Sequence, residues 1–448
     1  MDYENAMTRP LILLSIPGLR EKDIALMPHL REMTAGGEIA EFTPSFPCVT
    51  CPVQAAMTTG RPPSGHGVVA NGFYWRQSHR AEMWTSGNDC IQSPQLWDIL
   101  SHHDEALKSA VWFPLHSKGC EAAYVCTPAP IHNPDGSESL WCYTRPTELY
   151  GTLRDRGGHF PLQHFWGPLA GIQSTAWIAD SAQYAAETWR PNFFYIYLPH
   201  LDYAAQRSGP DSPAADQAVA ELDEVLGRMA AGFAAAYGGA PLWLVAGEYA
   251  IVPVDHVTYP NRVLREAGLL AVRDEDDGEH LDFATSRAWA LVDHQFSHIF
   301  VAGADPQLAG QVADLFRGQP GIETILVGDQ RRQYNLDHPR SGEVILISSP
   351  NSWQAYYWWH SDDRAPGFAR RVDIHRKPGY DPVELFFDPA TRSIPLDAML
   401  VKGSHGAPIV QSQQKTVLLA SEPCLLPTPP VADTQVFQIV LRHFGIEL

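Results

Sequence analysis

The residues best placed to do chemistry lie around Thr50. Thr50 stands at a predicted turn, just before an Ala-, Met- and Thr-rich run that is typical of a helix. Pro52 suits the first helical position, where no backbone N–H is needed. The amides of residues 51–53 would then point at an anion, because they lie at a helix N-terminus. The pattern predicts a hydroxyl nucleophile at a phosphate site, and the alternative is a threonine that only caps the helix.

Polar side chains follow two apolar segments further along the chain. Asp202 and Gln206 come after residues 192–198, and Glu248 comes after residues 241–246. Both segments are typical of strands buried on both faces of a parallel sheet. Ligands of such sheets bind outside the carboxyl ends of the strands. We therefore expect these three side chains to share one site, although a turn or cap residue is the alternative for each of the two carboxylates.

A histidine and a tyrosine are further candidates. His405 lies in a predicted loop beside Gly403 and Gly406, and glycine permits the backbone to approach a ligand closely. Tyr249, which follows Glu248, could donate a hydrogen bond to phosphate. A packed tyrosine with a bonded hydroxyl is the alternative.

The elements that must position these residues alternate along the chain. Helical patterns separate the apolar runs and are clearest where Val219, Leu222, Val225, Leu226 and Met229 form one stripe. The alternation predicts an α/β fold with a doubly wound, mainly parallel central sheet and helices on both faces. The apolar runs interpreted as central strands are residues 11–16, 109–113, 192–198, 241–246, 298–301 and 343–347.

The candidate residues are spread over nearly the whole chain, which favours one interleaved unit of 448 residues over separate small domains. Residues 255–345 are interpreted as an inserted α/β segment. Residues 351–400 form an irregular, aromatic-rich segment expected near the site. Its Trp353–Trp359 stretch could stack on a base or fill a core.

Composition narrows the partners. The formal net charge of −19 disfavours a nucleic acid polymer, because phosphate contacts need clustered Lys and Arg. A small anionic substrate in a local positive pocket remains possible. The cluster Arg370, Arg371, Arg376 and Lys377 could clamp its phosphate, with a solvated basic loop as the alternative.

The compartment is inferred from cysteines and hydropathy. Seven scattered cysteines give no disulfide framework, and the acidic N-terminal residues make a signal peptide unlikely to be present in this sequence. No apolar stretch reaches the ~18 residues needed to cross a bilayer. We expect a cytoplasmic protein without a membrane partner, and the sequence does not indicate an oligomeric state.

The motifs together resemble the alkaline phosphatase superfamily, in particular its type I nucleotide pyrophosphatase/phosphodiesterase branch. The nucleophile segment carries the resemblance through Thr50-Cys51-Pro52, Gly60, Ser64–Gly67 and Asn71. Four further segments fit in order: Arg9–Gly18, Leu198–Pro210, Leu242–Ile251 and Gly403–Gly406. The resemblance implies a single alkaline-phosphatase-like domain over residues 1–448, in which Thr50 is the nucleophile.

The resemblance also implies a metal site with altered ligands. The family normally holds two zinc ions with six Asp/His side chains. Asp202 and His405 match, and Glu248 replaces an aspartate, but Pro17, Gln206 and Tyr249 stand where the other ligands belong. We therefore expect one divalent ion rather than two, most simply zinc, held by Asp202, Gln206, Glu248 and His405.

Two further positions bear on substrate binding. Val53 stands where the phosphodiesterases carry an asparagine that contacts the phosphoryl group, and Asn71 is a weaker substitute. Asn71 and Tyr249 are therefore the substrate-binding candidates. Lost metal ligands could be rebuilt from His200, His256, His294, His298 or His375, although each is individually expected to be structural.

Three functions follow. The first is a metal-dependent hydrolase of a phosphodiester, pyrophosphate or phosphonate bond in a small molecule, acting through a covalent threonine intermediate. The second is a divergent, metal-poor phosphotransferase or biosynthetic enzyme. The third is a catalytically inactive module that keeps the anion pocket.

Overall fold

The computed structural model describes residues 9–132, 138–411 and 414–447. Its largest element is a nine-stranded sheet with the order β23-β2-β22-β11-β1-β10-β5-β6-β9. These strands are β1 (Leu11–Ser15), β2 (Glu38–Thr43), β5 (Ser109–Trp112), β6 (Tyr124–Pro128), β9 (Cys142–Arg145), β10 (Phe193–Tyr197), β11 (Leu242–Ala246), β22 (Thr416–Ala420) and β23 (Val431–Ala432).

The centre of this sheet is parallel. β1 lies between β10 and β11 and runs parallel to both, and β5 and β6 continue the parallel order. Antiparallel pairs occur only towards the sides, where β22 joins β11 to β2 and β9 covers β6. The predicted doubly wound, mainly parallel α/β fold is confirmed in this mixed sheet.

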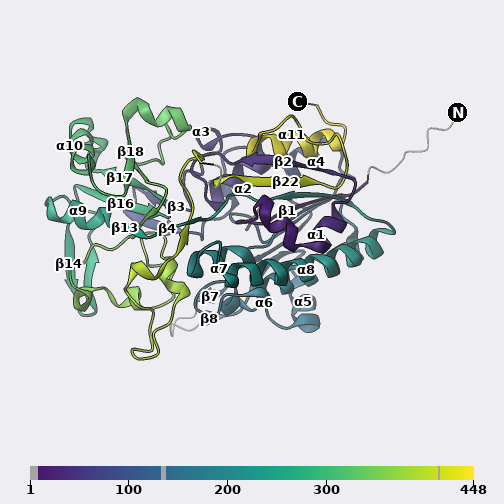
Figure 1. Cartoon of the computed structure of the whole chain (residues 1–448), viewed down its shortest axis with the longest axis horizontal. Coiled ribbons are helices and arrows are strands. Elements are labelled where there is room, and N and C mark those ends of the chain that lie inside the picture. Colours follow the sequence, from purple (N-terminus) through teal and green to yellow (C-terminus); the bar gives the residue numbers. More distant parts are fainter. Residues whose placement is uncertain (1–8, 133–137, 412–413, 448) are drawn as a thin grey trace.

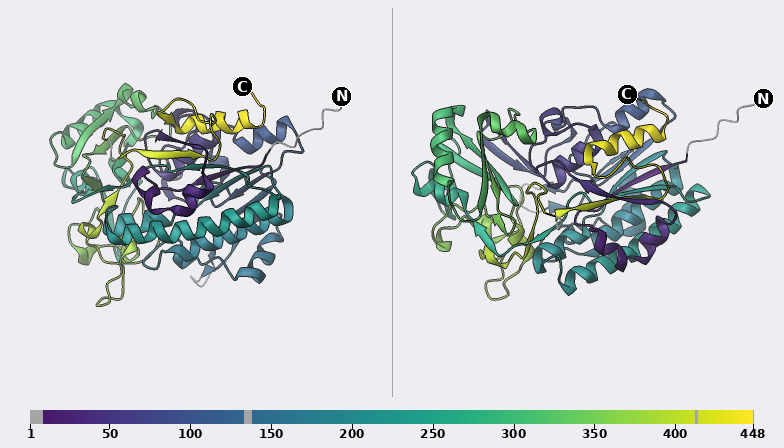
Figure 2. Two further views of the ribbon diagram at one scale, coloured as in Figure 1. Left: turned by 45° about the vertical axis from the view of Figure 1, so that its right-hand side comes forward. Right: turned by 45° about the horizontal axis from the view of Figure 1, so that its top comes forward.

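Helices cover both faces of the sheet (Figures 1 and 2). One layer consists of α1 (Pro28–Met33), α5 (Leu149–Gly157), α6 (Ile172–Trp189) and α8 (Pro213–Tyr237), and the other of α2 (Thr50–Thr59), α4 (Leu96–His103) and α11 (Asp433–His443). Every residue of β1, β10 and β11 is buried, as expected for strands with helices on both faces.

The longest helix shows how the sequence selects its buried face. The predicted apolar stripe of α8 is buried along its whole length against the sheet and its neighbouring helices. Ser212 caps this helix by accepting a hydrogen bond from the Ala215 amide, and Pro213 occupies the first turn. The remaining helices are α3 (Pro63–His66), α7 (His200–Ser208), α9 (Pro260–Glu266) and α10 (Pro306–Phe316).

A second, antiparallel sheet lies at the other end of the molecule (Figure 1). Its order is β16-β17-β19-β18, formed by β16 (Ala288–Asp293), β17 (Phe296–Val301), β18 (Ile322–Val327) and β19 (Val344–Ser348). The apolar runs at 298–301 and 343–347 were expected in the central sheet, and they form this sheet instead. A run of apolar residues marks burial on both faces but does not identify the sheet to which a strand belongs.

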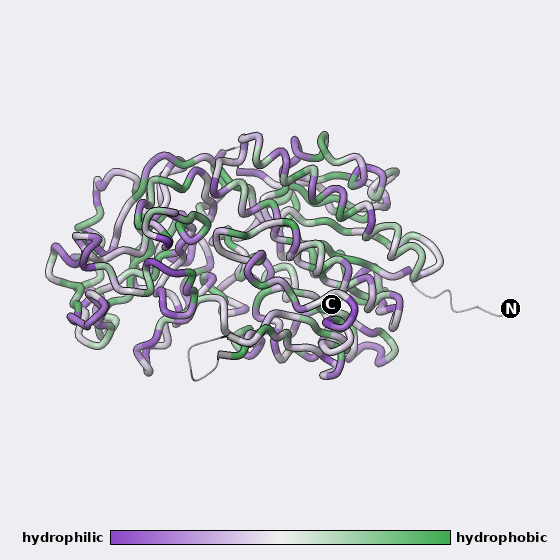
Figure 3. Tube along the Cα trace, turned by 90° about the horizontal axis from the view of Figure 1, so that it is seen from below, coloured by the Kyte–Doolittle hydropathy of each residue, from purple (hydrophilic) through white to green (hydrophobic). Residues whose placement is uncertain are grey.

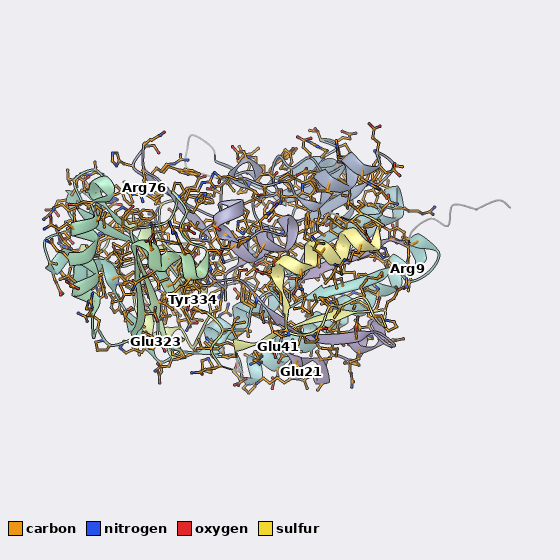
Figure 4. The ribbon with its side chains drawn as sticks, turned by 90° about the horizontal axis from the view of Figure 1, so that it is seen from above. Arg9, Glu21, Glu41, Arg76, Glu323 and Tyr334 are labelled. Atoms are coloured by element: carbon orange, nitrogen blue, oxygen red, sulfur yellow. The ribbon has the colours of Figure 1, made fainter. Side chains whose placement is uncertain are left out.

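Short strand pairs lie outside the two larger sheets. These are β3 (Gly72–Trp75) with β4 (Arg80–Met83), β7 (Ile131–His132) with β8 (Glu138–Ser139), β12 (Val252–Pro253) with β21 (Gly403–Ser404), β13 (His256–Thr258) with β20 (Ser352–Gln354), and β14 (Val272–Glu275) with β15 (Gly278–Leu281). The β3–β4 hairpin packs on the second sheet, where Arg76 lies 2.7 Å from Glu343 and over the ring of Phe300 (Figure 4).

The aromatic-rich segment fills the core beside the second sheet. Trp353 and all of residues 356–359 are buried there, together with Trp289 and Tyr74. Of the two predicted roles for these rings, stacking on a base or filling a core, the structure shows the second. The hydrophobic parts of the chain lie mainly within its strands and buried helix faces (Figure 3). Within the described residues, no helix combines the length and hydropathy that a bilayer crossing requires.

Candidate active site

The candidate residues gather at the carboxyl ends of the three central parallel strands. Thr50 is the first residue of α2, Asp202 and Gln206 lie in α7 after β10, and Glu248 follows β11. His405 directly follows β21, and the β12–β21 pair brings it to the same place. The position agrees with the rule for ligand sites in open α/β sheets.

Direct contacts join these residues into one cluster. The Thr50 Oγ1 atom lies 2.9 Å from the Tyr249 hydroxyl. The Tyr249 ring stacks on the His405 ring, with 3.7 Å between centroids. The His405 Nε2 atom lies 3.7 Å from Asp202 Oδ1. The Gln206 Nε2 group donates to Asp202 Oδ2 at 2.6 Å.

Thr50 is not a helix cap. Val49 occupies the N-cap position, and no side chain caps this end of α2. The Thr50 side chain bonds to Tyr249 instead of to the backbone, so its hydroxyl is directed into the cluster. The alternative that Thr50 only caps the helix is therefore excluded.

The amides that follow Thr50 are already engaged. The Cys51 N–H donates to Asn71 Oδ1 at 2.9 Å, Pro52 has no N–H, and the Val53 N–H donates to the Val49 carbonyl at 3.2 Å. The expectation that the amides of residues 51–53 point at an anion is therefore wrong. The helix begins two residues earlier than Pro52 suggested, and a side chain distant in sequence satisfies the Cys51 amide.

Asn71 supports the start of α2. Its side-chain oxygen accepts from Cys51, and its Nδ2 and backbone N–H donate to the two oxygens of Asp293 at 3.0 and 2.7 Å. All of these groups are buried. This arrangement leaves Asn71 one Nδ2 hydrogen for a substrate, so its main contacts fix the backbone beside Thr50.

Asp202 and His405 both present a free ligand atom. The His405 Nδ1–H donates to the Cys48 carbonyl at 2.9 Å, which leaves Nε2 with its lone pair. Burial lowers the pKa of His405 well below its usual value, so the ring is neutral. Neither His405 Nε2 nor Asp202 Oδ1 has a hydrogen-bond partner, although both atoms are buried.

The charge on Asp202 is costly in this environment. Burial raises the pKa of its carboxyl to about 7, and only the Gln206 amide offsets this effect. A carboxylate in such a position is stabilised by a cation. An unpartnered carboxylate oxygen and an unpartnered imidazole nitrogen, 3.7 Å apart, fit two ligands of one divalent ion.

Gln206 is engaged at both ends of its amide. While Nε2 donates to Asp202, Oε1 accepts from the Tyr380 hydroxyl at 2.6 Å. Gln206 therefore orients Asp202 in this structure, and its oxygen would reach an ion only by releasing Tyr380. The predicted ligand role of Gln206 stays a prediction.

Glu248 belongs to a separate hydrogen-bond network. Its Oε1 atom accepts from the Ser15 hydroxyl and from Gln54 Nε2, the latter at 2.8 Å. Gln54 in turn accepts from the Leu115 amide at 2.7 Å. Burial raises the pKa of Glu248 to about 8. The backbone of Glu248 has φ = 51°, a left-handed conformation that non-glycine residues adopt mainly where the surroundings impose it.

His294 is the one alternative histidine that reaches the cluster. Its ring lies 3.9 Å from the His405 ring and 3.6 Å from the Tyr380 ring, and its Nδ1 atom lies 2.6 Å from Asp293 Oδ1. Its φ is 58°, so it too is held in a left-handed conformation. The sequence offered the Asp-His spacing as a signal but could not place it.

The other alternative histidines lie in different environments. His298 uses both ring nitrogens on the backbone of Val69 and Gly342. His200 pairs with Glu221, His256 bonds to Ser352, and His375 is exposed.

Basic residues 370–377 do not offer a free cluster of charge. Lys377 is buried between Asp381 and Glu384, at 2.7 and 2.6 Å, and Arg376 pairs with Asp373 on the surface. Two of the four cations of the expected phosphate clamp are therefore neutralised by carboxylates. Among the described residues, the one group of three close ligand side chains is Glu275, Asp277 and His280 on the β14–β15 hairpin, away from Thr50 in sequence and largely exposed.

Sequence reasoning missed Ser15, Gln54 and Tyr380. Gln54 could have been found, because it lies one helical turn after Thr50 and so shares its face of α2. Ser15 is the only polar residue of β1 and lies at its carboxyl end. Tyr380 carries no comparable signal, since it comes from an irregular segment.

Comparisons with known proteins point in one direction. A family model described as type I phosphodiesterase / nucleotide pyrophosphatase matches residues 11–381. The chain is 24% identical over 236 residues to an uncharacterised pyrophosphatase/phosphodiesterase of Schizosaccharomyces pombe, a match that covers 51% of this chain and 41% of that protein. The chain thus spans well under two thirds of this curated relative.

Solved structures share the fold. Phosphonoacetate hydrolase from Sinorhizobium meliloti 1021 superimposes with TM-scores of 0.62 in its complex with phosphonoformate and 0.63 in its complex with phosphonoacetate. The sequence identity is 16%, and the match covers 97% of this chain and 96% of the hydrolase. At this identity the likeness shows the fold alone.

Proposed function

Because the chain belongs to the type I phosphodiesterase/nucleotide pyrophosphatase family, a class of phosphodiesterase- and pyrophosphatase-like hydrolases, we propose that it hydrolyses a phosphodiester, pyrophosphate or phosphonate bond in a small molecule. The observation that carries the proposal is the group formed by the Thr50 hydroxyl, Tyr249, His405 and Asp202, in which two buried ligand atoms are free. Such a group provides a nucleophile and a place for a cation, linked through the Tyr249 side chain.

One divalent ion would be held by Asp202 Oδ1 and His405 Nε2, with Gln206 beside them. When bound, it would neutralise charge on the phosphoryl oxygens and lower the pKa of water. Zinc is the simplest choice for a carboxylate and an imidazole, although zinc usually takes three or four protein ligands. Glu248 keeps one buried oxygen, Oε2, without a hydrogen-bond partner, while its Oε1 accepts from Ser15 and Gln54.

In the proposed reaction the Thr50 oxygen attacks phosphorus. A new O–P bond forms as the Thr50 proton passes to solvent, and the bond to the leaving group breaks as that group takes up a proton from solvent. Water then cleaves the Thr50–phosphorus bond and restores the hydroxyl. Tyr249 and Asn71 keep Thr50 in place, Tyr249 through its hydroxyl and Asn71 through the Cys51 amide.

We also propose that the protein is cytoplasmic. All seven cysteines are free, and six of them are buried. Free buried thiols are consistent with a reducing cytoplasm. A small phosphate-containing substrate agrees with the family.

The test is hydrolysis of bis(p-nitrophenyl) phosphate before and after chelation, with zinc added back. We expect chelator-sensitive turnover that Thr50→Ala lowers by at least about 10³-fold, as removal of a nucleophile does. Thr50→Val keeps the side-chain volume and is the matched control for packing. Full activity of Thr50→Ala would exclude Thr50 as the nucleophile.

A second candidate is favoured by Tyr249 and Gln206, which replace ionisable ligands with neutral groups. It is a divergent, metal-poor enzyme or an anion-binding module. Ligand-dependent thermal stabilisation by inorganic phosphate without turnover of any phosphodiester would support it over the hydrolase.

A further inference from the structure

The half of the site next to Thr50 contains few free ligand atoms. Pro17 has no side-chain donor atom. Glu248 Oε1 accepts from the Ser15 hydroxyl and the Gln54 amide, while its Oε2 is buried without a hydrogen-bond partner. The Tyr249 hydroxyl is taken by Thr50 Oγ1 at 2.9 Å. A cation at this position would find one free ligand atom on these three residues, Glu248 Oε2, whereas zinc usually takes three or four protein ligands.

The contacts that occupy this half are buried and connected. Ser15, Gln54, Glu248 and Tyr249 are each at most 3% exposed. Gln54 is held from the far side, because its Oε1 accepts from the Leu115 amide at 2.7 Å. Releasing Gln54 from Glu248 would leave a buried amide hydrogen without a partner, which is unfavourable.

Tyr249 cannot move towards a cation independently. Its ring is stacked on His405 at 3.7 Å and 9°, while its hydroxyl bonds to Thr50. His405 is fixed in turn by the Cys48 carbonyl. The phenol therefore links the nucleophile candidate to the free ligand pair formed by His405 and Asp202.

We propose that this half of the site works without an ion, and that the Ser15–Gln54–Glu248 network and the Tyr249 hydroxyl occupy the place of a second cation. The chain then binds one divalent ion, and Tyr249 is a positioning residue that holds Thr50. This inference rests on the proposed function for the identity of the site, but its test is the number of bound ions, which does not depend on turnover.

The experiment counts the ions bound to the full-length protein. Protein saturated with zinc and passed through gel filtration is analysed by elemental mass spectrometry, and affinities are measured by competition with a chromogenic chelator. We expect one zinc ion per chain. Two ions of comparable affinity would overturn the inference, and so would none.

Single variants locate the ion. Tyr249→Phe keeps the ring stack and removes only the hydroxyl, so we expect one bound ion and a kcat lower by about 10²-fold, with little change in KM. Loss of the ion in this variant would show that Tyr249 is a ligand and would overturn the inference. His405→Ala should lose the ion.

A reconstructed variant tests the replacement directly. Pro17→Asp combined with Tyr249→His supplies two ionisable ligands next to Glu248, and we expect a second zinc ion per chain. The folded state of this variant is checked by circular dichroism, and a folded variant that still binds one ion counts against the inference. The single variants keep the test decisive if the double variant does not fold.

The two proposals fail separately. One bound ion without hydrolysis would leave this inference standing and contradict the proposed function. Two bound ions with hydrolysis that depends on Thr50 would do the opposite.

Discussion

At the residue scale, the central pair is Asp202 and His405. Each has a buried ligand atom without a hydrogen-bond partner, and the two atoms lie 3.7 Å apart. Burying a carboxylate whose one donor is the Gln206 amide is unfavourable, and the proposed cation between the two atoms would offset that cost.

The first prediction concerns these two side chains. Asp202→Asn and His405→Ala should each weaken zinc binding by at least about 10²-fold, because a site with few ligands cannot lose one. The measurement is the zinc Kd from chelator competition. His256→Ala is the matched control, since His256 bonds to Ser352 outside the cluster, and equal effects of all three variants would contradict the assignment.

A second prediction concerns Gln206. Gln206→His replaces a weak amide ligand with an imidazole next to Asp202, so it should tighten zinc binding by about tenfold or more. Because Tyr380 donates to Gln206 at 2.6 Å, Tyr380→Phe should be combined with it to free the new ring. Unchanged affinity in the folded double variant would show that residue 206 does not face the ion.

At the element scale, the start of α2 depends on side chains from elsewhere in the chain. Asp293, at the β16–β17 turn, binds Asn71, and Asn71 binds the first free amide of α2. The second sheet thereby contributes to the position of Thr50.

Asn71→Ala should therefore lower the stability of the protein by weakening the start of α2. It leaves the Cys51 amide and one Asp293 oxygen buried without this partner, so we expect the free energy of unfolding to fall by about 3 kcal/mol. Urea denaturation measures this value. If Asn71 served only to bind substrate, the stability would be unchanged and KM alone would rise.

Hydrogen bonds also join α11 to the segment that precedes α2. Asp433 accepts from the Ser45 amide and hydroxyl, both at 2.8 Å, and is completely buried. Burial raises the pKa of Asp433 to about 6 from its ordinary 3.8. The folded protein therefore holds this proton more tightly than the unfolded chain does.

The sign of the pH effect follows from proton linkage. Between about pH 4 and pH 6 the folded state binds more protons at Asp433 than the unfolded state, so this carboxyl makes stability fall as pH rises, by up to about 3 kcal/mol. Asp433→Asn should remove this contribution from the urea unfolding curves at pH 4 and pH 7. Asp314→Asn, at an exposed position, is the matched control. If the free energy of unfolding of Asp433→Asn changed with pH as that of the unmodified protein does, the account would be contradicted.

At the scale of the whole molecule, the proposed ion joins distant parts of the chain. Asp202 lies in α7 and His405 follows β21, so an ion bound by both stabilises only the folded state. Zinc at 100 times its Kd should add about 2.7 kcal/mol of stability. Thermal unfolding with and without zinc measures the shift in Tm, which His405→Ala should abolish and His256→Ala should retain. A shift that survives His405→Ala would place the ion elsewhere.

The sequence predicted the fold class well because burial on both faces leaves continuous apolar runs, as in β1 and β11. It misplaced the strands β17 and β19, since such runs do not reveal pairing partners. Two expectations about domain organisation stay predictions. One is the inserted α/β segment at residues 255–345, and the other is the single domain over the whole chain.

The site was predictable in part for the same reason. Residues that follow buried strands, such as Asp202 and Glu248, could be grouped from the chain alone. Contacts across long sequence separations could not, and these decide the chemistry: Tyr249 on Thr50, Ser15 on Glu248 and Tyr380 on Gln206. The amides after Thr50 were misjudged because Asn71 satisfies the first of them.

The stereochemical course at phosphorus tests the central claim most directly. A phosphorothioate diester of defined configuration is hydrolysed in ¹⁸O-labelled water, and the configuration of the product is determined. A covalent Thr50 intermediate requires two displacements at phosphorus, so the account predicts net retention. Net inversion would mean that water attacks the substrate directly, and would contradict Thr50 as the nucleophile.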